Sequence, residues 1–246
     1  MQDNTDTKTH RSPGNAANGH KIARRTLLIG MPAFLAACQN GSLSQSGPEM
    51  LPPEPQVSPV HQAMYAAMPH EQFPIPAIDV SRIDPQFLRQ EVADPTGERA
   101  GTLVVDTDNR FLYLVQEDGR ALRYGIGVGR EGLAWSGRGD ILMKREWPRW
   151  TPTQNMMRRD PSLEQYRNGM EPGLDNPLGA RALYIFENGR DTLYRLHGTN
   201  EPWSIGMAMS SGCIRLFNQD IIDLYNRVPR GAQVLVMEHR QTDAAV

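Results

Sequence analysis

The runs His197-Gly198-Thr199-Asn200 and Ser210-Ser211-Gly212-Cys213-Ile214-Arg215-Leu216 lie with nine residues between them near the end of this 246-residue chain. Cys213 is the only cysteine after Cys38, and His197 is the only histidine between His70 and His239. A free thiol has a pKa of about 8.5 and is mostly protonated at neutral pH, so a nucleophilic cysteine needs a base beside it. The two runs therefore predict a Cys–His acyl-transfer site with small residues next to the thiol.

Short apolar segments on both sides of these runs predict a mainly β domain. We expect strands at residues 103–105, 111–115, 123–128, 139–143, 182–186, 192–196 and 233–237. The Asn188-Gly189 pair is typical of a type I′ hairpin turn, and residues 218–227 predict a helix with Asn218 as its N-cap. The expected fold is a β-sandwich or small barrel with a few short helices, forming one catalytic domain over residues 79–240.

In this fold His197 ends a strand and Cys213 begins the next ordered segment, so a rigid β scaffold can bring the two side chains together. Arg215 follows Cys213 by two residues and shares its face on a strand, which suits contact with a substrate carboxylate or carbonyl, or a structural ion pair. Further pocket candidates are Asn200, Trp203, Ser210 and Ser211. For Trp203, as for Trp135, Trp147 and Trp150, packing in the core or under a loop is the favoured interpretation.

Residues 147–179 are dominated by proline, glycine and polar side chains, with one short helix expected at 162–168. An irregular stretch of this length inside a compact domain predicts a functional loop or lid.

Composition excludes several classes of function. The four histidines after Cys38 are scattered and only one cysteine accompanies them, so we predict no metal site and no cofactor. The formal net charge is −2 without a run of like charges, which offers no surface for nucleic acid. A mean hydropathy of −0.52 argues against a polytopic membrane protein. We expect a monomer.

Residues 1–37 have the order of an export signal: basic residues, a short apolar stretch from Leu27, and small residues before Cys38. The apolar stretch of about ten residues is too short to span a bilayer, which needs about 20. Leu35-Ala36-Ala37-Cys38 resembles a bacterial lipobox, which implies a lipid on Cys38 and a periplasmic protein anchored to the inner or outer membrane of the cell envelope. Cleavage by an ordinary signal peptidase is the alternative, and Arg24-Arg25 leaves twin-arginine export open.

Residues 38–78 contain many prolines and no lasting period of 2 or 3.6. This composition predicts a flexible tether between the lipidated Cys38 and the domain.

The two opening runs together resemble the signature of the L,D-transpeptidase catalytic domain family, also called YkuD-like, over roughly residues 100–238. The residue before Gly212 is often His in that family and is Ser211 here. The resemblance implies that Cys213 is the nucleophile and that His197 is first general base and then general acid. It also implies that the Gly198 carbonyl orients the imidazole, and that the Gly212 N–H helps to stabilise the tetrahedral oxyanion.

The resemblance further implies a peptidoglycan L,D-transpeptidase that forms a Cys213 thioester with a stem tetrapeptide and releases D-alanine. The acyl group would pass to an amine of another stem or of a protein, and a carbapenem would acylate the same thiol. Hydrolysis of that thioester, by an L,D-carboxypeptidase or amidase, stays open because the choice depends on how the acceptor pocket excludes water. A non-catalytic wall-binding lipoprotein is a third possibility, although such a protein would be expected to lose Cys213 or His197.

Overall fold

The computed structural model describes residues 58–129, 135–208 and 213–239. All of them belong to one compact unit, Pro52–Val246, which is separate from Met1–Leu51. The predicted signal sequence and the predicted lipid site at Cys38 lie outside the described residues, as do Ser210, Ser211 and Gly212.

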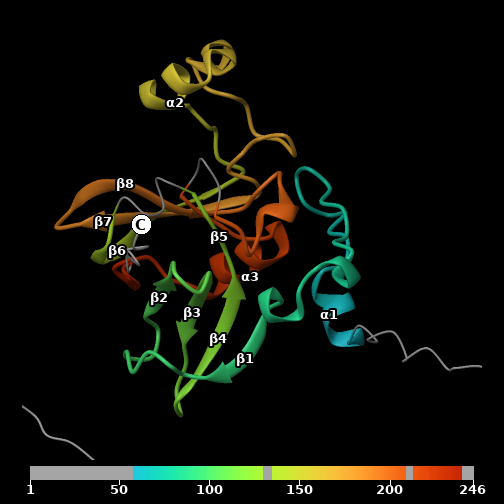
Figure 1. Cartoon of the computed structure of the whole chain (residues 1–246), viewed down its shortest axis with the longest axis vertical. Helices are drawn as coiled ribbons and strands as arrows, with labels where there is room; N and C mark the ends of the chain where they lie inside the picture. The colour runs from blue at the N-terminus through green and yellow to red at the C-terminus, as the bar shows by residue number, and fades with distance from the viewer. Residues whose placement is uncertain (1–57, 130–134, 209–212, 240–246) are drawn as a thin grey trace, which may run out of the picture. The chain divides into compact units, whose positions relative to one another are not determined.

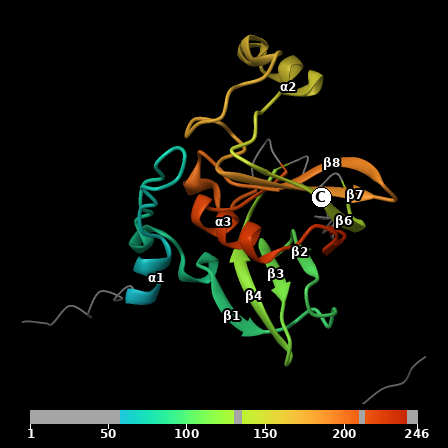
Figure 2. The ribbon, with the colours of Figure 1, turned by 180° about the vertical axis from the view of Figure 1, so that it is seen from behind.

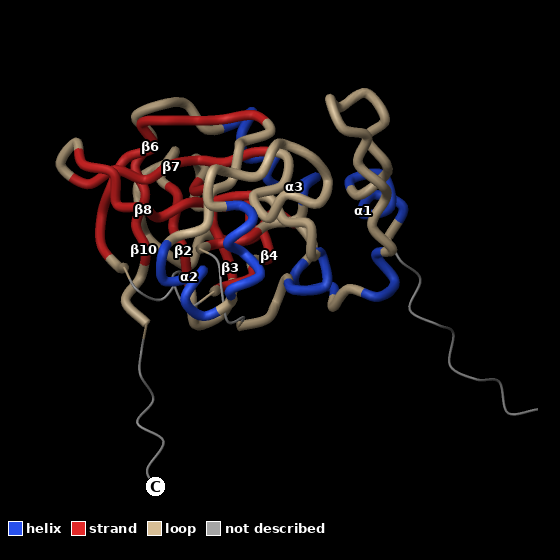
Figure 3. The backbone as a smooth tube through the Cα atoms, turned by 90° about the horizontal axis from the view of Figure 1, so that it is seen from above, coloured by secondary structure: helices blue, strands red, loops and turns tan. Residues whose placement is uncertain are grey.

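The described strands form a single ten-stranded sheet, in the order β1-β4-β3-β2-β10-β6-β7-β8-β9-β5 (Figures 1 and 3). Most neighbours are antiparallel, and the parallel pairs are β2 with β10 and β8 with β9. The strands are β1 (Gln90–Ala93), β2 (Leu103–Asp106), β3 (Phe111–Val115), β4 (Arg120–Gly125), β5 (Gly127–Val128), β6 (Gly137–Glu146), β7 (Arg181–Glu187), β8 (Arg190–His197), β9 (Ile214–Arg215) and β10 (Gln233–Val236).

The order of the strands requires the sheet to curl back on itself. β4 stands second from one edge and β5 forms the opposite edge, yet Ile126 alone separates them in the chain. The two Cα steps from Gly125 to Gly127 span at most about 7 Å, so the two sides of the sheet must come together. The predicted β-sandwich or barrel, with few helices, is confirmed.

The helix α3 (Asn218–Arg227) fills the space that the curled sheet encloses. Figures 1 and 2, from opposite sides, place it between β1–β4 and β6–β8. Ile221 and Leu224 of α3 belong to the same buried cluster as Leu112 of β3 and Leu183 of β7. The sheet thus wraps one core, and its strands have a rigid inner support.

Local predictions from the sequence agree with the structure, with one correction. The hairpin between β7 and β8 turns through Asn188 and Gly189, with φ of 50° and 76°, as a type I′ turn requires. α3 spans the predicted residues, but the predicted N-cap was wrong. Phe217 occupies the N-cap position, and the side chain of Asn218 bonds to distant backbone instead.

The structure differs from the predicted tether over residues 58–78, a segment that we call the strap. It begins with α1 (Pro59–Met64) and lies to one side of the sheet (Figure 3). Tyr65 has no exposed surface and stacks edge-on against Phe217, with ring centroids 5.5 Å apart. Ile75 is also buried. The prolines of the strap suggested an extended coil, but its apolar side chains find partners on the domain.

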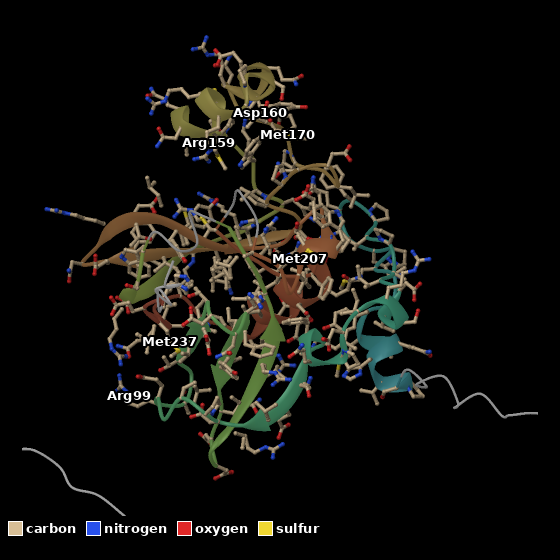
Figure 4. All side chains as sticks on the ribbon, viewed as in Figure 1. Arg99, Arg159, Asp160, Met170, Met207 and Met237 are labelled. Atoms are coloured by element: carbon tan, nitrogen blue, oxygen red, sulfur yellow. The ribbon has the colours of Figure 1, made fainter. Side chains whose placement is uncertain are left out.

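Residues 151–169 form a lobe that projects from the sheet (Figure 1). It contains α2 (Gln154–Arg159) and a 3₁₀ helix (Pro161–Tyr166) in place of the predicted helix at 162–168. Two backbone hydrogen bonds between Trp150 and Met170 close its base. Figure 4 shows Arg159 and Asp160 on the lobe and Met170 at this base.

Candidate active site

His197 ends one strand, and Cys213 immediately precedes the parallel strand beside it. β8 ends at His197 and β9 begins at Ile214, with Leu196 opposite Ile214 and His197 opposite Arg215. Successive side chains of a strand point to opposite faces, and Leu196 and Ile214 point into the core. His197 and Arg215 therefore share the other face. The structure places the two predicted residues at neighbouring strands, with the sulfur of Cys213 next to the Leu193 carbonyl of β8.

A bulge in β8 turns a main-chain carbonyl toward the thiol. The register between β7 and β8 shifts between Tyr184 and Phe186, near Leu193, which has a φ of 63°. The thiol of Cys213 donates to the Leu193 carbonyl, with 3.7 Å between sulfur and oxygen. The sequence missed the bulge because residues 192–196 have the composition of an uninterrupted strand.

The imidazole of His197 is oriented by its own neighbour in the chain. Its Nδ1 lies 2.6 Å from the Gly198 carbonyl oxygen. Because a carbonyl only accepts, we assign the proton of the neutral ring to Nδ1, which leaves Nε2 as a proton acceptor. The predicted contact of the Gly198 carbonyl is present.

His197 is buried, with 3% of its surface exposed. Burial, the largest effect, and the positive charges of Arg215 and Arg195 lower the pKa of His197 to about 4, while the carbonyls of Gly198 and Pro177 act in the opposite direction. The imidazole is therefore neutral at pH 7 and able to take a proton.

The Gly198 peptide is itself held from two sides. Its N–H donates to the Arg181 carbonyl at 3.0 Å. The Asn218 side chain accepts from the Ala180 N–H at 3.0 Å and donates to the Thr199 carbonyl at 2.9 Å. A Cβ on Gly198 would overlap Asn218 Oδ1, so only glycine fits here. Asn218 is a supporting residue that the sequence suggested only as a helix cap.

Arg215 forms a structural ion pair, one of the two roles that the sequence left open. It is 4% exposed, and its Nη1 forms an ion pair with Glu201 Oε2 at 3.3 Å. Its Nε and Nη2 are buried without a hydrogen-bond partner among the described residues. The guanidinium thus has a partial structural partner and two donors left for a ligand.

The remaining predicted pocket residues differ in exposure. Asn200 Nδ2 donates to the Asp175 carbonyl at 3.0 Å, which ties the start of the loop after β8 to the chain that precedes β7. Trp203, in a 3₁₀ helix (Pro202–Ser204), is 56% exposed. Packing was the favoured interpretation for Trp203 and is wrong, whereas Trp147 is buried as expected.

Within residues 58–129, 135–208 and 213–239, no three His, Cys, Asp or Glu side chains are grouped so that they could hold a metal ion. In the same ranges no helix is long and apolar enough to cross a membrane.

A sequence model of the L,D-transpeptidase catalytic domain (YkuD) matches residues 100–236, more than half of the chain. The chain belongs to the L,D-transpeptidase catalytic domain family. It is 36% identical over 159 residues to the probable L,D-transpeptidase ErfK/SrfK of Escherichia coli K12. The matched region covers 61% of this chain and 48% of that protein. The chain thus spans about half the length of this relative.

Two further relatives differ in what their names say. A putative L,D-transpeptidase of Fuscovulum blasticum, from the ATP synthase subunits region, is 35% identical over 138 residues, 55% of this chain and 68% of that protein. A crystal structure from Brucella melitensis is 49% identical, covers 65% of this chain and 99% of its own, and has a TM-score of 0.45. That protein carries the name probable carnitine operon oxidoreductase.

Proposed function

We propose that the chain is a peptidoglycan L,D-transpeptidase with Cys213 as nucleophile and His197 as general base. One observation carries the proposal. A buried imidazole, neutral at pH 7 and oriented through Nδ1 by the Gly198 carbonyl, ends β8, and Cys213 immediately precedes the adjacent parallel strand β9. A thiol beside a neutral base is the arrangement that nucleophilic acyl transfer needs.

In the proposed reaction the thiol proton passes to Nε2 of His197 as the sulfur attacks the carbonyl carbon of the L-centre diamino acid in a stem tetrapeptide. The C–N bond to the terminal D-alanine then breaks, and His197 returns the proton to the leaving amine. An amine of a second stem, or of a protein, attacks the resulting thioester. The amide forms, the C–S bond breaks, and the thiol regains a proton.

Arg215 is proposed to bind the substrate. Its Nε and Nη2 have no partner among the described residues, and Arg215 lies opposite His197 on the adjacent strand. A guanidinium that is desolvated before binding recognises a carboxylate or carbonyl strongly, because water no longer competes. Asn200, Trp203, Ser210 and Ser211 stay proposed pocket residues, and the Gly212 N–H stays the proposed oxyanion donor.

We also propose that the protein is exported and lipidated on Cys38, so that the domain acts in the periplasm on the cell wall. The support is the order of basic, apolar and small residues before Cys38. Several acyl chains on one residue give stable anchoring where one chain is marginal. Labelling cells with a palmitate analogue tests this: a wild-type protein without label, or equal label on Cys38→Ser, contradicts lipidation.

The activity is tested on a chain that begins at Gln39, because this form keeps the whole strap and omits the lipid. It is incubated with purified muropeptides and the products are followed by mass spectrometry. Cross-linked dimers with release of D-alanine support transpeptidation, and loss of D-alanine without dimers supports hydrolysis. Cys213→Ala is expected to abolish both reactions without lowering the thermal midpoint by more than a few degrees.

If Cys213→Ala and wild type give the same products, the proposed nucleophile is wrong. If neither changes the muropeptides but both bind them, the chain is a wall-binding protein. His197→Ala should slow acylation by about 100-fold or more, which is the contribution of a positioned general base.

A further inference from the structure

The strap (residues 58–78) lies outside residues 100–236, the part of the chain that the family model matches. Several polar contacts hold it against the domain. Tyr65 donates from its hydroxyl to Asp220 Oδ2 at 2.9 Å, and Gln219 Nε2 donates to the Pro76 carbonyl at 3.0 Å. Another contact is made by Glu71, and it reaches furthest toward the active site.

The carboxylate of Glu71 joins two parts of the chain that flank the lobe. Its Oε1 accepts from Arg181 Nη2 at 2.8 Å, and its Oε2 accepts from Trp147 Nε1 at 3.0 Å. The Arg181 side chain is 8% exposed and that of Glu71 is 15% exposed. Trp147 follows β6 and Arg181 begins β7, so Glu71 bridges the chain on either side of residues 148–180.

From Arg181 the path to the imidazole is short. The Arg181 carbonyl accepts from the Gly198 N–H at 3.0 Å, and the carbonyl of the same glycine accepts from His197 Nδ1 at 2.6 Å. Arg181 Nη1 also donates to the Ala180 carbonyl at 2.9 Å, which fixes the guanidinium against its own backbone. The position of the Gly198 peptide, and with it the direction of Nε2, therefore depends on where Arg181 is held.

We propose that Glu71 is a positioning residue for the general base: through Arg181 and the Gly198 peptide, the strap holds His197 in the orientation that activates Cys213. The inference rests on the proposed function, since it assumes that His197 serves Cys213. It assigns a task to a segment that contributes no residue to the Cys–His pair.

The ion pair has no good substitute if Glu71 is removed. The other acid near Arg181 is Glu146, whose Oε2 lies 3.8 Å from Nη2 and whose side chain is 61% exposed. A buried guanidinium that loses its partner moves toward the nearest remaining carboxylate or toward water, because an unpaired buried charge is strongly unfavourable. Either movement shifts the backbone that Gly198 bonds to.

The test is made on the full chain, by measuring iodoacetamide alkylation of the Cys213 peptide against pH. Glu71→Gln is nearly isosteric and removes the charge. We expect alkylation at pH 7 to slow about tenfold, less than the about 100-fold or greater loss expected for a missing general base. The acid limb of the profile should move up by about half a unit as His197 becomes better solvated. The ¹³C resonance of the His197 imidazole should titrate with the same shift.

The matched control is Glu98→Gln. Glu98 also forms a carboxylate–guanidinium pair, with Arg138 at 2.6 and 3.0 Å, and it has no contact with the active site. This variant is expected to keep the wild-type rate and the wild-type acid limb. A Glu71→Gln profile equal to that of Glu98→Gln overturns the proposal.

The double variant Glu71→Gln/Arg181→Gln separates positioning from simple instability, since it removes the unpaired charge. If positioning is the role, the thermal midpoint recovers but alkylation stays slow. If midpoint and rate both recover, the effect of Glu71 was one of stability and the proposal is wrong.

His197→Ala keeps the two proposals apart. If it is alkylated like wild type, the proposed Cys–His pair fails, while the imidazole titration still shows whether Glu71 controls the surroundings of His197. If His197→Ala is slow and Glu71→Gln is not, only the inference about Glu71 fails.

Discussion

Lowering the pH should leave His197 in its neutral form well below the range in which an ordinary histidine gains its proton. Burial, with the charges of Arg215 and Arg195 as smaller causes, lowers its pKa from 6.5 to about 4. At pH 5.0 about 90% of such a group is neutral, against about 3% of a histidine with an ordinary pKa. A step that needs the neutral imidazole should therefore run about 30-fold faster at pH 5.0 than an ordinary histidine would allow.

The step to measure is acylation of Cys213 by a carbapenem, followed on the Cys213 peptide by quenched mass spectrometry between pH 4 and pH 8. A single-turnover rate avoids any later hydrolysis or transfer. Down to pH 5.0, the contribution of His197 to the wild-type rate is expected to stay within about 10% of its value at neutral pH. Near pH 4 that contribution should be halved. His197→Ala supplies the baseline that carries no contribution from the imidazole.

An acid limb centred between pH 6 and pH 7 would refute this reasoning, because it would mean that water reaches the imidazole. The ¹³C titration of His197 distinguishes the possible origins of such a limb. If the limb lies near pH 6.5 while His197 titrates near pH 4, another group controls the rate and His197 is not the base.

Three further changes have outcomes that the structure determines. Asp220 is buried, and mainly this burial raises its pKa to about 7. Its contribution to stability is therefore present at low pH and is lost as the pH rises through 7. Between pH 6 and pH 8, the free energy of unfolding in urea should fall by about 1.4 kcal/mol less for Asp220→Asn than for wild type. Gly179→Ala should lower the free energy of unfolding by about 1–3 kcal/mol more than Gly189→Ala in the same assay. Both glycines have positive φ, but only at Gly179 would a Cβ overlap the active-site backbone, 2.6 Å from the amide nitrogen of Thr199. Arg215→Gln removes a charge that lowers the pKa of His197 and should move the acid limb of Cys213 alkylation up by about half a unit, whereas Arg215→Lys should not.

Features that depend on neighbours in the chain could be predicted from the sequence. Short apolar runs placed β3 and β7 correctly, and Asn188-Gly189 predicted the turn between β7 and β8. The placement of His197 at the end of β8 and of Cys213 just before the neighbouring β9 followed from the expected strand ends. The position of the Gly198 carbonyl followed from the family resemblance.

Features that depend on contacts between distant parts of the chain could not be predicted. Glu71 and Arg181 are 110 residues apart, and Asn218 lies 38 residues from Ala180. No local pattern marks either contact, because glutamate in a proline-rich segment and asparagine at a helix start each have a common local explanation. The same holds for the strap as a whole. Composition alone cannot show that Tyr65 packs against Phe217 and bonds to Asp220 of α3.

The group that orients His197 determines what kind of nucleophile the site holds at rest. A carboxylate beside Nδ1 would raise the pKa of the imidazole and favour a thiolate–imidazolium pair. Here a neutral carbonyl, that of Gly198, takes this place, while burial and two arginines lower the pKa of the imidazole. Such an arrangement favours a neutral thiol beside a neutral imidazole, and the Leu193 carbonyl, 3.7 Å from the sulfur, can accept from that thiol. Because oxidants attack the thiolate, a cysteine that is protonated at rest would be protected in the oxidising envelope where we propose that it works.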